Sequence, residues 1–129
     1  MGTVGQGGSE CVERTTWLYK KESDLMTYWV GFEIKPDALV ITDFEMGEIL
    51  KKTWHDDDLE HYVIIKREHI ADFLTAVCAQ KSLDFATSDL TNGVISDIMH
   101  AAFKGQDKMI FQVQDVLKAE EIPYDFQVW

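Results

Sequence analysis

The spacing of apolar residues changes near position 70, and this change limits what the chain can fold into. Across residues 26–34, apolar side chains occupy alternate positions, which is the period of a β-strand with one face on a core. From Ile70 they recur at every third or fourth position, which gives the stripe of an amphipathic helix. Because strands precede helices and do not alternate with them, the sequence predicts an α+β fold with a mainly antiparallel sheet.

The strands are expected before Lys66, joined as an N-terminal meander. Pro36 interrupts the second apolar run, because proline fixes φ and cannot donate a backbone hydrogen bond. Asp37 favours a turn there. Gly47 and the acidic residues near position 56 mark two further turns. The expected strands are 15–19, 26–34, 38–44, 49–54 and 59–66.

Three amphipathic helices follow, and their apolar stripes need a surface to cover. The sheet is that surface, so we expect all three helices on one of its faces. Ser88 or Thr91 is placed to cap the start of the second helix, and Gly105 to end it in a left-handed conformation. Asp107 is expected to cap the third helix, and Tyr124–Trp129 alternates as a final edge strand. The stripes are Ile70–Cys78, Leu90–Phe103 and Met109–Leu117.

With 129 residues and 46% hydrophobic content, the chain suits one domain with one core. Its first ten residues differ, because they hold four of the eight glycines. Such a stretch cannot bury enough surface to offset the entropy of ordering it. We expect residues 1–12 to be a flexible tail and residues 13–129 to be a single α+β domain. Cys11 and Cys78 are expected to be reduced thiols and not a disulfide.

The formal net charge of −11, from 12 basic and 23 acidic residues, narrows the choice of partner. An anionic surface repels phosphate, so nucleic acid and anionic membranes are disfavoured as partners. A basic protein is the complementary partner. We find no signal-peptide pattern and no apolar run near the roughly 20 residues of a membrane span. The expected location is the cytoplasm.

Acidic residues gather between Glu33 and Glu60, where nine acids accompany three lysines. In the expected meander they occupy two turns at opposite ends of the sheet, so one group is enough to meet a partner. The group from His55 to Glu60 is the denser one, and Trp54 beside it offers an apolar anchor. The alternatives are solubility for the acids and packing beneath the helices for Trp54. Trp17, Trp29 and Trp129 have the same two interpretations, an interface anchor or a packed core residue. The candidate partner-binding residues are Glu45, Glu48, Trp54, Asp56, Asp57, Asp58 and Glu60.

The nearest approach to a metal or acid–base site consists of His55, Asp56, Asp58 and His61. Imidazole and carboxylate groups ligate divalent cations. Adjacent carboxylates point to different sides, however, and the glycine of a calcium-binding loop is missing. The sequence holds no nucleophile elbow and no phosphate-binding glycine loop. We therefore expect no catalytic residue, no metal and no cofactor, with a metal-dependent hydrolase built on this cluster as an alternative.

Two features of the central segment carry a family resemblance. An acidic strand–turn–strand starts at Ala38, and the run EHYVIIKREH (Glu60–His69) leads a strand into an amphipathic helix. In these features the segment Ala38–Val77 resembles the small immunity proteins of bacterial polymorphic toxin systems, in particular those of contact-dependent growth inhibition. The resemblance implies an intracellular antidote that binds the C-terminal toxin domain of a large effector, often a nuclease, and blocks it by occlusion. It assigns no individual residue.

The charge agrees with this resemblance, because a nuclease toxin needs a basic substrate cleft and an acidic inhibitor gains steering by occupying it. The expected function is therefore an immunity protein whose acidic surface occludes a basic toxin site. A regulatory or adaptor domain that binds another protein is the second hypothesis. The metal-dependent hydrolase is the third.

Overall fold

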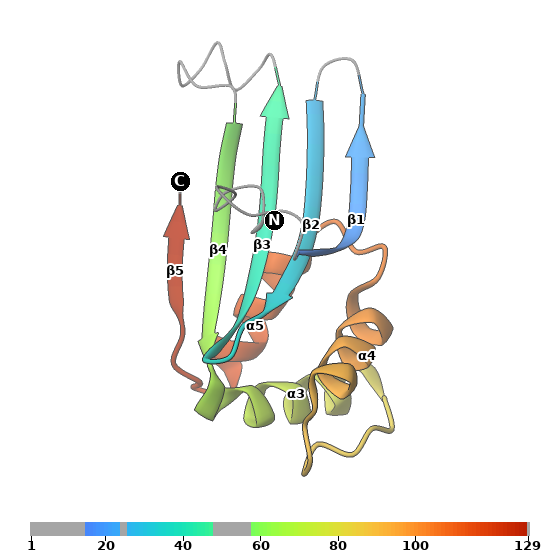
Figure 1. Ribbon diagram of the computed structural model, residues 1–129, viewed down its shortest axis with the longest axis vertical. Helices are drawn as coiled ribbons and strands as arrows, with labels where there is room; N and C mark the ends of the chain where they lie inside the picture. The colour runs from blue at the N-terminus through green and yellow to red at the C-terminus, as the bar shows by residue number, and fades with distance from the viewer. Residues whose placement is uncertain (1–14, 24–25, 48–57, 129) are drawn as a thin grey trace, which may run out of the picture.

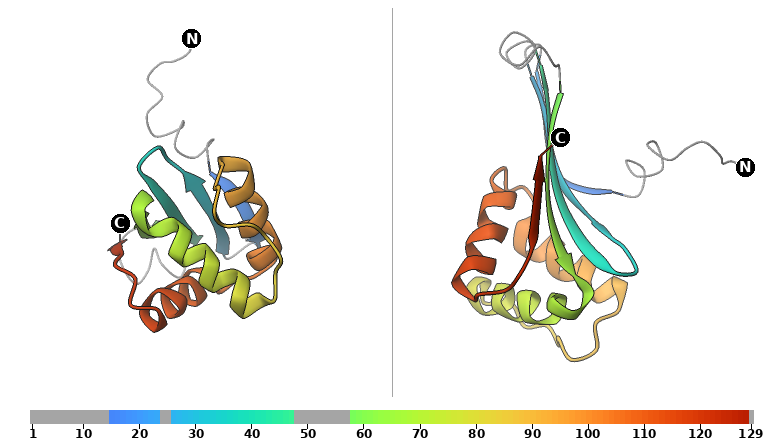
Figure 2. Two further views of the ribbon diagram at one scale, coloured as in Figure 1. Left: turned by 90° about the horizontal axis from the view of Figure 1, so that it is seen from below. Right: turned by 90° about the vertical axis from the view of Figure 1, so that its left-hand side faces the viewer.

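The protein forms a five-stranded antiparallel sheet with three helices on one of its faces (Figures 1 and 2). The structure, a computed structural model, describes residues 15–23, 26–47 and 58–128. The strands are β1 (Thr16–Glu22), β2 (Met26–Ile34), β3 (Ala38–Gly47), β4 (Asp58–Lys66) and β5 (Asp125–Val128), paired in the order β1-β2-β3-β4-β5. The helices are α3 (Arg67–Lys81), α4 (Asn92–Phe103) and α5 (Met109–Ala119). The predicted α+β fold with a C-terminal edge strand is confirmed.

The helices cover the face of the sheet that carries alternate residues of β2, β3 and β4. Leu39 and Ile41 of β3 and Val63 and Ile65 of β4 are fully buried there, because side chains two positions apart in a strand point the same way. The predicted stripes of α3 and α5 are buried, and the buried stripe of α4 begins at Ile95, one residue after the predicted Val94, which is half-buried. The core therefore lies between this face and the three helices.

β1 departs from regular alternation at a β-bulge. Trp17 pairs with Gly31, whereas Tyr19 pairs with the adjacent residue of β2, so the register shifts between them. The bulge places Trp17 and Tyr19 on opposite faces of the sheet although they are two positions apart. The Leu18 carbonyl accepts a hydrogen bond from the Gly105 N–H at 2.9 Å, which ties β1 to the turn after α4.

Two of the predicted helix ends are confirmed and one is wrong. The Thr91 hydroxyl caps α4 by accepting from the backbone N–H three residues on, and Gly105 after this helix has a φ of +78°. At α5 the N-cap residue is Lys108, with no side-chain capping bond. The Asp107 carbonyl instead accepts a hydrogen bond from the Tyr28 hydroxyl at 2.8 Å. A contact with the sheet thus takes the place of the predicted local cap.

The pairing of β3 with β4 corrects a further prediction. Glu45 lies opposite Leu59, and the pair next to it joins Met46 with Asp58, so β3 and β4 are direct neighbours. The end of β3 and the start of β4 therefore lie side by side, so Glu45 and Asp58 are at the same end of the sheet and not, as was predicted, at opposite ends. The predicted strand 49–54 and the predicted tail 1–12 lie outside the described residues. Within those residues, no helix has the length and apolarity needed to cross a membrane.

Candidate functional site

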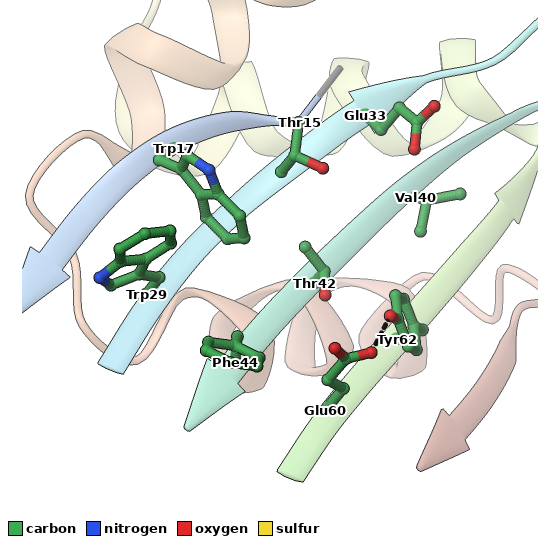
Figure 3. A pocket seen from close by; sticks show the side chains of 9 residues that line it. All are labelled: Thr15, Trp17, Trp29, Glu33, Val40, Thr42, Phe44, Glu60 and Tyr62. Carbon is green, nitrogen blue, oxygen red and sulfur yellow. Dashed lines mark hydrogen bonds between the residues drawn. The ribbon is translucent and has the colours of Figure 1, made fainter. Parts of the chain in front are cut away.

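The face of the sheet opposite the helices carries a groove of about 310 Å³ (Figure 3). Alternate residues of β2, β3 and β4 line it, because residues two apart share a face, and the start of β1 runs along one side. Thr42 lies at the centre of the groove and is only 7% exposed, although it faces away from the helices. The lining residues are Thr15, Trp17, Trp29, Glu33, Val40, Thr42, Phe44, Glu60 and Tyr62.

Strand register arranges these side chains in rows across the sheet. Trp29 of β2 lies opposite Phe44 of β3, which in turn lies opposite Glu60 of β4. The next row consists of Gly31, Thr42 and Tyr62. Neighbouring strands are about 4.8 Å apart, so each row brings residues from three strands within about 10 Å of one another.

Two tryptophans form the wall of the groove on the β1 side. The ring centroids of Trp17 and Trp29 are 5.2 Å apart in an edge-to-face arrangement, and that of Phe44 is 6.3 Å from Trp29. The Lys20 ammonium lies 4.8 Å from the Trp29 ring centroid, which is a cation–π contact. Edge-to-face and cation–π contacts hold aromatic rings in fixed orientations. The wall is therefore pre-organised.

Gly31 allows β1 to approach β2 closely enough to build that wall. A Cβ atom at this position would lie 2.3 Å from the Thr16 carbonyl oxygen, which no side chain can tolerate. The glycine is thus required by close backbone approach. Trp17 pairs with it, at the place where the start of β1 bends away from the helices (Figure 2, right).

Glu33 and Glu60 are the charged side chains among the described residues that line the groove. Both are half-buried. The Glu60 carboxylate accepts a hydrogen bond from the Tyr62 hydroxyl, which fixes its position beside the groove (Figure 3). Aromatic walls with a negative rim are complementary to a basic side chain that has an apolar stem.

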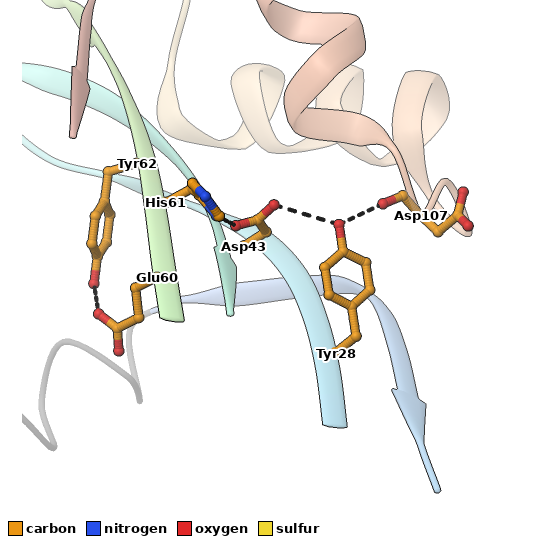
Figure 4. A network of polar contacts seen from close by, with 6 residues as sticks. All are labelled: Tyr28, Asp43, Glu60, His61, Tyr62 and Asp107. Carbon is orange, nitrogen blue, oxygen red and sulfur yellow. Dashed lines mark hydrogen bonds and ion pairs between the residues drawn. The ribbon is translucent and has the colours of Figure 1, made fainter. Parts of the chain in front are cut away.

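Asp43 holds a polar network on the opposite, helix-covered face (Figure 4). Its side chain is 3% exposed, and Asp43 Oδ1 lies 2.7 Å from His61 Nδ1. The Tyr28 hydroxyl lies 3.4 Å from Asp43 Oδ2 and donates to the Asp107 carbonyl at 2.8 Å. Burial raises the pKa of Asp43 and outweighs the opposing effect of His61. Burial and the nearby Asp43 charge also raise the pKa of Tyr28. The network joins three strands to the start of α5.

Glu45 lies on the same face as Asp43, in a second hollow of about 440 Å³. Burial is the main cause that raises the pKa of Glu45, and the Asp43 charge adds to it. Lys21 and Lys108 also line this hollow, and Phe111 at its side is 60% exposed. Its charges are of both signs, unlike those of the groove.

The sheet separates the predicted partner-binding residues that the structure describes. Glu60 faces the groove and Glu45 faces the helix side, so the two do not share a surface. Asp58 begins β4 and pairs through its backbone with Met46. The other predicted residues, Glu48, Trp54, Asp56 and Asp57, lie outside the described residues, as does Trp129.

The hydrolase hypothesis placed His61 in a cluster with His55, Asp56 and Asp58, but in the structure His61 contacts other residues. His61 is half-buried in β4, where its Nδ1 contacts Asp43 and its ring stacks on Phe126 with centroids 5.9 Å apart. Of the other members of this cluster, His55 and Asp56 lie outside the described residues, and Asp58 is the first residue of β4. Over residues 15–23, 26–47 and 58–128, no group of three or more His, Cys, Asp or Glu side chains is placed to hold a metal ion. Cys78 is a free, buried thiol.

Most of the groove residues were absent from the predicted site. Trp17 and Trp29 were considered as anchors but not chosen, and Phe44 and Tyr62 were not considered. The signal was present in β2, where Trp29 and Glu33 fall on the alternate positions that do not face the core. The sequence does not contain the register that joins these positions to β3 and β4.

A comparison of this chain with protein-family models, curated proteins and solved structures finds no match.

Proposed function

We propose that this protein is an immunity protein, an inhibitor that binds the C-terminal toxin domain of a contact-dependent growth inhibition effector. The groove on the uncovered face of the sheet is the observation that carries this proposal. It combines a pre-organised aromatic wall with two carboxylates on a chain of net charge −11. Aromatic anchors in desolvated pockets are typical of the residues that dominate protein–protein affinity.

The groove and the family resemblance involve the same part of the chain. The segment Ala38–Val77, which resembles immunity proteins, includes β3, β4 and most of α3. It supplies five of the nine lining residues of the groove, which are Val40, Thr42, Phe44, Glu60 and Tyr62. The segment that suggested the function therefore also forms the floor and the β4 side of the candidate binding site.

Inhibition by occlusion follows from charge and shape. A nuclease domain binds phosphate through a basic cleft, which an acidic inhibitor is attracted to and covers. The acids of this chain speed the encounter, and the aromatic groove slows dissociation because it excludes water from the centre of the interface. In this proposal the protein inhibits the toxin by binding alone and catalyses no reaction.

The test uses a toxin-like C-terminal domain that an open reading frame next to the gene for this protein would encode. The purified domain and this protein are mixed, and binding is measured by calorimetry alongside the activity of the toxin. We expect a one-to-one complex and loss of toxin activity. Phe44→Ala should weaken binding by about tenfold or more, the effect of removing an interface anchor. Phe111→Ala is the matched control, because Phe111 is exposed on the helix side.

Two results would contradict the proposal. A toxin domain that keeps full activity in the presence of excess inhibitor rules out the immunity function. Weaker binding on Phe111→Ala, with no effect of Phe44→Ala, moves the interface away from the groove. Circular dichroism of both variants shows whether each is folded, so that loss of binding is not confused with loss of structure.

A further inference from the structure

We propose that the groove holds one arginine side chain of the bound partner, with its alkyl stem along the aromatic wall and its guanidinium at Glu60. This inference rests on the proposed function and identifies the chemistry of its main contact. The argument uses the order of residues across the sheet, the charge of the lining and the position of Tyr62.

Across the sheet from β2 to β4, the groove side chains change from aromatic to negatively charged. In one row, Trp29 and Phe44 supply aromatic surface and Glu60 supplies a carboxylate. The distance across three strands is about 10 Å, which suits a side chain that is apolar along its stem and charged at its tip. Thr42, at the centre of the floor, is small enough to leave room above it.

The charge of the lining selects a cation. Glu33 and Glu60 are acidic, and no lysine or arginine is among the described residues that line the groove. The chain itself already places a cation on the wall, because the Lys20 ammonium sits 4.8 Å from the Trp29 ring centroid. Lys20 approaches from β1 and is not a lining residue, so Glu33 and Glu60 remain available to a partner.

Glu60 and Tyr62 favour arginine over lysine. The Tyr62 hydroxyl donates to one oxygen of Glu60, and each carboxylate oxygen has two acceptor positions, so both oxygens remain able to accept. A guanidinium group matches a carboxylate with two parallel N–H donors and stacks on an aromatic ring. An ammonium group contacts an aromatic ring as a point charge, but it is not planar, so it can neither form this pair of parallel donors nor stack on the ring, and it is more strongly hydrated.

The first experiment uses Nα-acetyl-L-arginine N-methylamide as a probe, titrated into ¹⁵N-labelled protein. We expect saturable shifts of the Trp17 and Trp29 indole N–H signals and of the Thr42 amide signal. Glu60→Gln should weaken the probe about fivefold or more, because a charge-assisted bidentate pair is lost. Glu33→Gln is a second variant, with a smaller expected effect. The lysine analogue of the probe should have an affinity lower by about threefold or more.

Matched controls separate the groove from general attraction to an acidic protein. Glu68→Gln removes the same charge from an exposed position on α3, where the side chain is 74% exposed, and should leave probe affinity within about twofold. Equal weakening by Glu60→Gln and Glu68→Gln would overturn the proposal, as would the absence of saturable shifts at Trp17 and Trp29. Higher probe affinity on Arg14→Gln would also overturn it, because the groove would then belong to an arginine of this chain that directly precedes Thr15.

A second experiment keeps this inference separate from the proposed function. Toxin affinity that falls about tenfold or more in Glu60→Gln, with Glu68→Gln unchanged, supports the arginine contact. Toxin that binds wild type and Glu60→Gln equally overturns the arginine contact and leaves the immunity function standing. A toxin domain that does not bind, while the probe still does, overturns the immunity function and leaves the arginine site supported.

Discussion

At the scale of single residues, Asp43 is the charged side chain that is buried among the residues that the structure describes. Its carboxyl group is withdrawn from water and depends on His61 and Tyr28 for polar contacts. Burial penalises the charged form of a carboxyl group, and here that penalty exceeds the favourable effect of both partners, so the pKa is raised. Asp43 is therefore a position where the fold gives up stability at neutral pH.

Asp43→Asn should make the stability of the protein less dependent on pH. In the wild type, the unfolded chain loses the Asp43 proton near pH 3.9, whereas the folded protein keeps it until its raised pKa is passed. The folded state then binds more protons than the unfolded state, so the free energy of unfolding falls as pH rises through this window. The asparagine variant lacks this fall.

Urea unfolding from about pH 3 to pH 8 measures the difference, since the midpoint reports stability. Asp72→Asn is the control, because Asp72 is exposed on α3 and the variant should follow the wild-type profile. Burial still raises the pKa of Glu45 in the asparagine variant, although the contribution of the Asp43 charge is lost, so a smaller pH dependence remains. Parallel profiles for wild type and Asp43→Asn would show that Asp43 titrates as an ordinary surface carboxyl.

His61→Ala should destabilise the protein by about 1.5–3 kcal/mol, the loss expected when a hydrogen bond to a charged group is removed. The reason is that His61 Nδ1 lies 2.7 Å from the buried Asp43 carboxylate, which would lose this partner. His69→Ala is the matched control, because its contact is with the exposed Glu68 at 3.8 Å and such pairs contribute little. Chemical denaturation of both variants compares the two positions. Equal small losses would mean that His61 behaves as a surface residue.

At the scale of single elements, the path of β1 depends on one glycine. Gly31→Ala places a Cβ atom against the Thr16 backbone, and backbone cannot move aside as the end of a flexible side chain can. We expect a loss of about 1–3 kcal/mol, as for other overpacked sites. Gly93→Ala in α4 is the control, because its nearest contact would be Thr91 Oγ1 at 3.8 Å. That change should be neutral or stabilising by up to about 1 kcal/mol.

Thermal unfolding of the two glycine variants tests this expectation, and the Trp17 indole signal reports on β1 itself. If Gly31→Ala unfolds like Gly93→Ala and leaves the Trp17 signal unchanged, then β1 does not need the close approach. The groove would then tolerate sequence change at its wall.

The stripe of α3 carries a second prediction at this scale. Phe73 is fully buried between α3 and the sheet, so Phe73→Ala leaves a cavity and should cost about 3–5 kcal/mol. Asp72→Ala on the exposed side of the same helix should change stability by less than about 0.5 kcal/mol. Denaturant unfolding gives both values. A loss below about 1 kcal/mol for Phe73→Ala would mean that α3 repacks around the gap.

The elements themselves were largely predictable from the sequence, because their periods follow from local geometry. The stripe of α3, the cap at Thr91 and the left-handed Gly105 were all expected and are present. The cap expected at Asp107 is absent, because the contact of this residue with Tyr28 joins positions 79 apart in the sequence and cannot be read from local spacing. The same limit explains the groove, since rows such as Trp29–Phe44–Glu60 exist only once strand register is known.

At the scale of the whole molecule, the two faces of the sheet have different roles. One face is covered by α3, α4 and α5 and holds the core. The other carries the aromatic groove, half-buried but without a helix above it (Figures 2 and 3). An exposed aromatic groove on a small domain is typical of a surface that meets a partner. The net charge of −11 attracts a basic partner at long range, before the groove makes contact with it.

The last prediction separates the long-range effect of charge from the short-range effect of the groove. Replacing Asp56, Asp57 and Asp58 together by lysine changes the net charge from −11 to −5. Association with a basic toxin domain should slow and become less sensitive to salt, because steering acts through charges screened over about 8 Å at physiological ionic strength. Dissociation should change less. Phe44→Ala should do the opposite, with faster dissociation and nearly unchanged association, because a desolvated anchor acts after contact.

Stopped-flow association at several salt concentrations, together with dissociation by competition, gives both rates for each variant. If the triple lysine variant and wild type have the same salt dependence, Asp56, Asp57 and Asp58 serve solubility and do not steer the partner. If Phe44→Ala slows association as strongly as the lysine variant, the groove is not the desolvated centre of the interface. If the lysine variant instead speeds dissociation most, these acids contact the toxin directly and the interface extends from the groove to the β3–β4 connection.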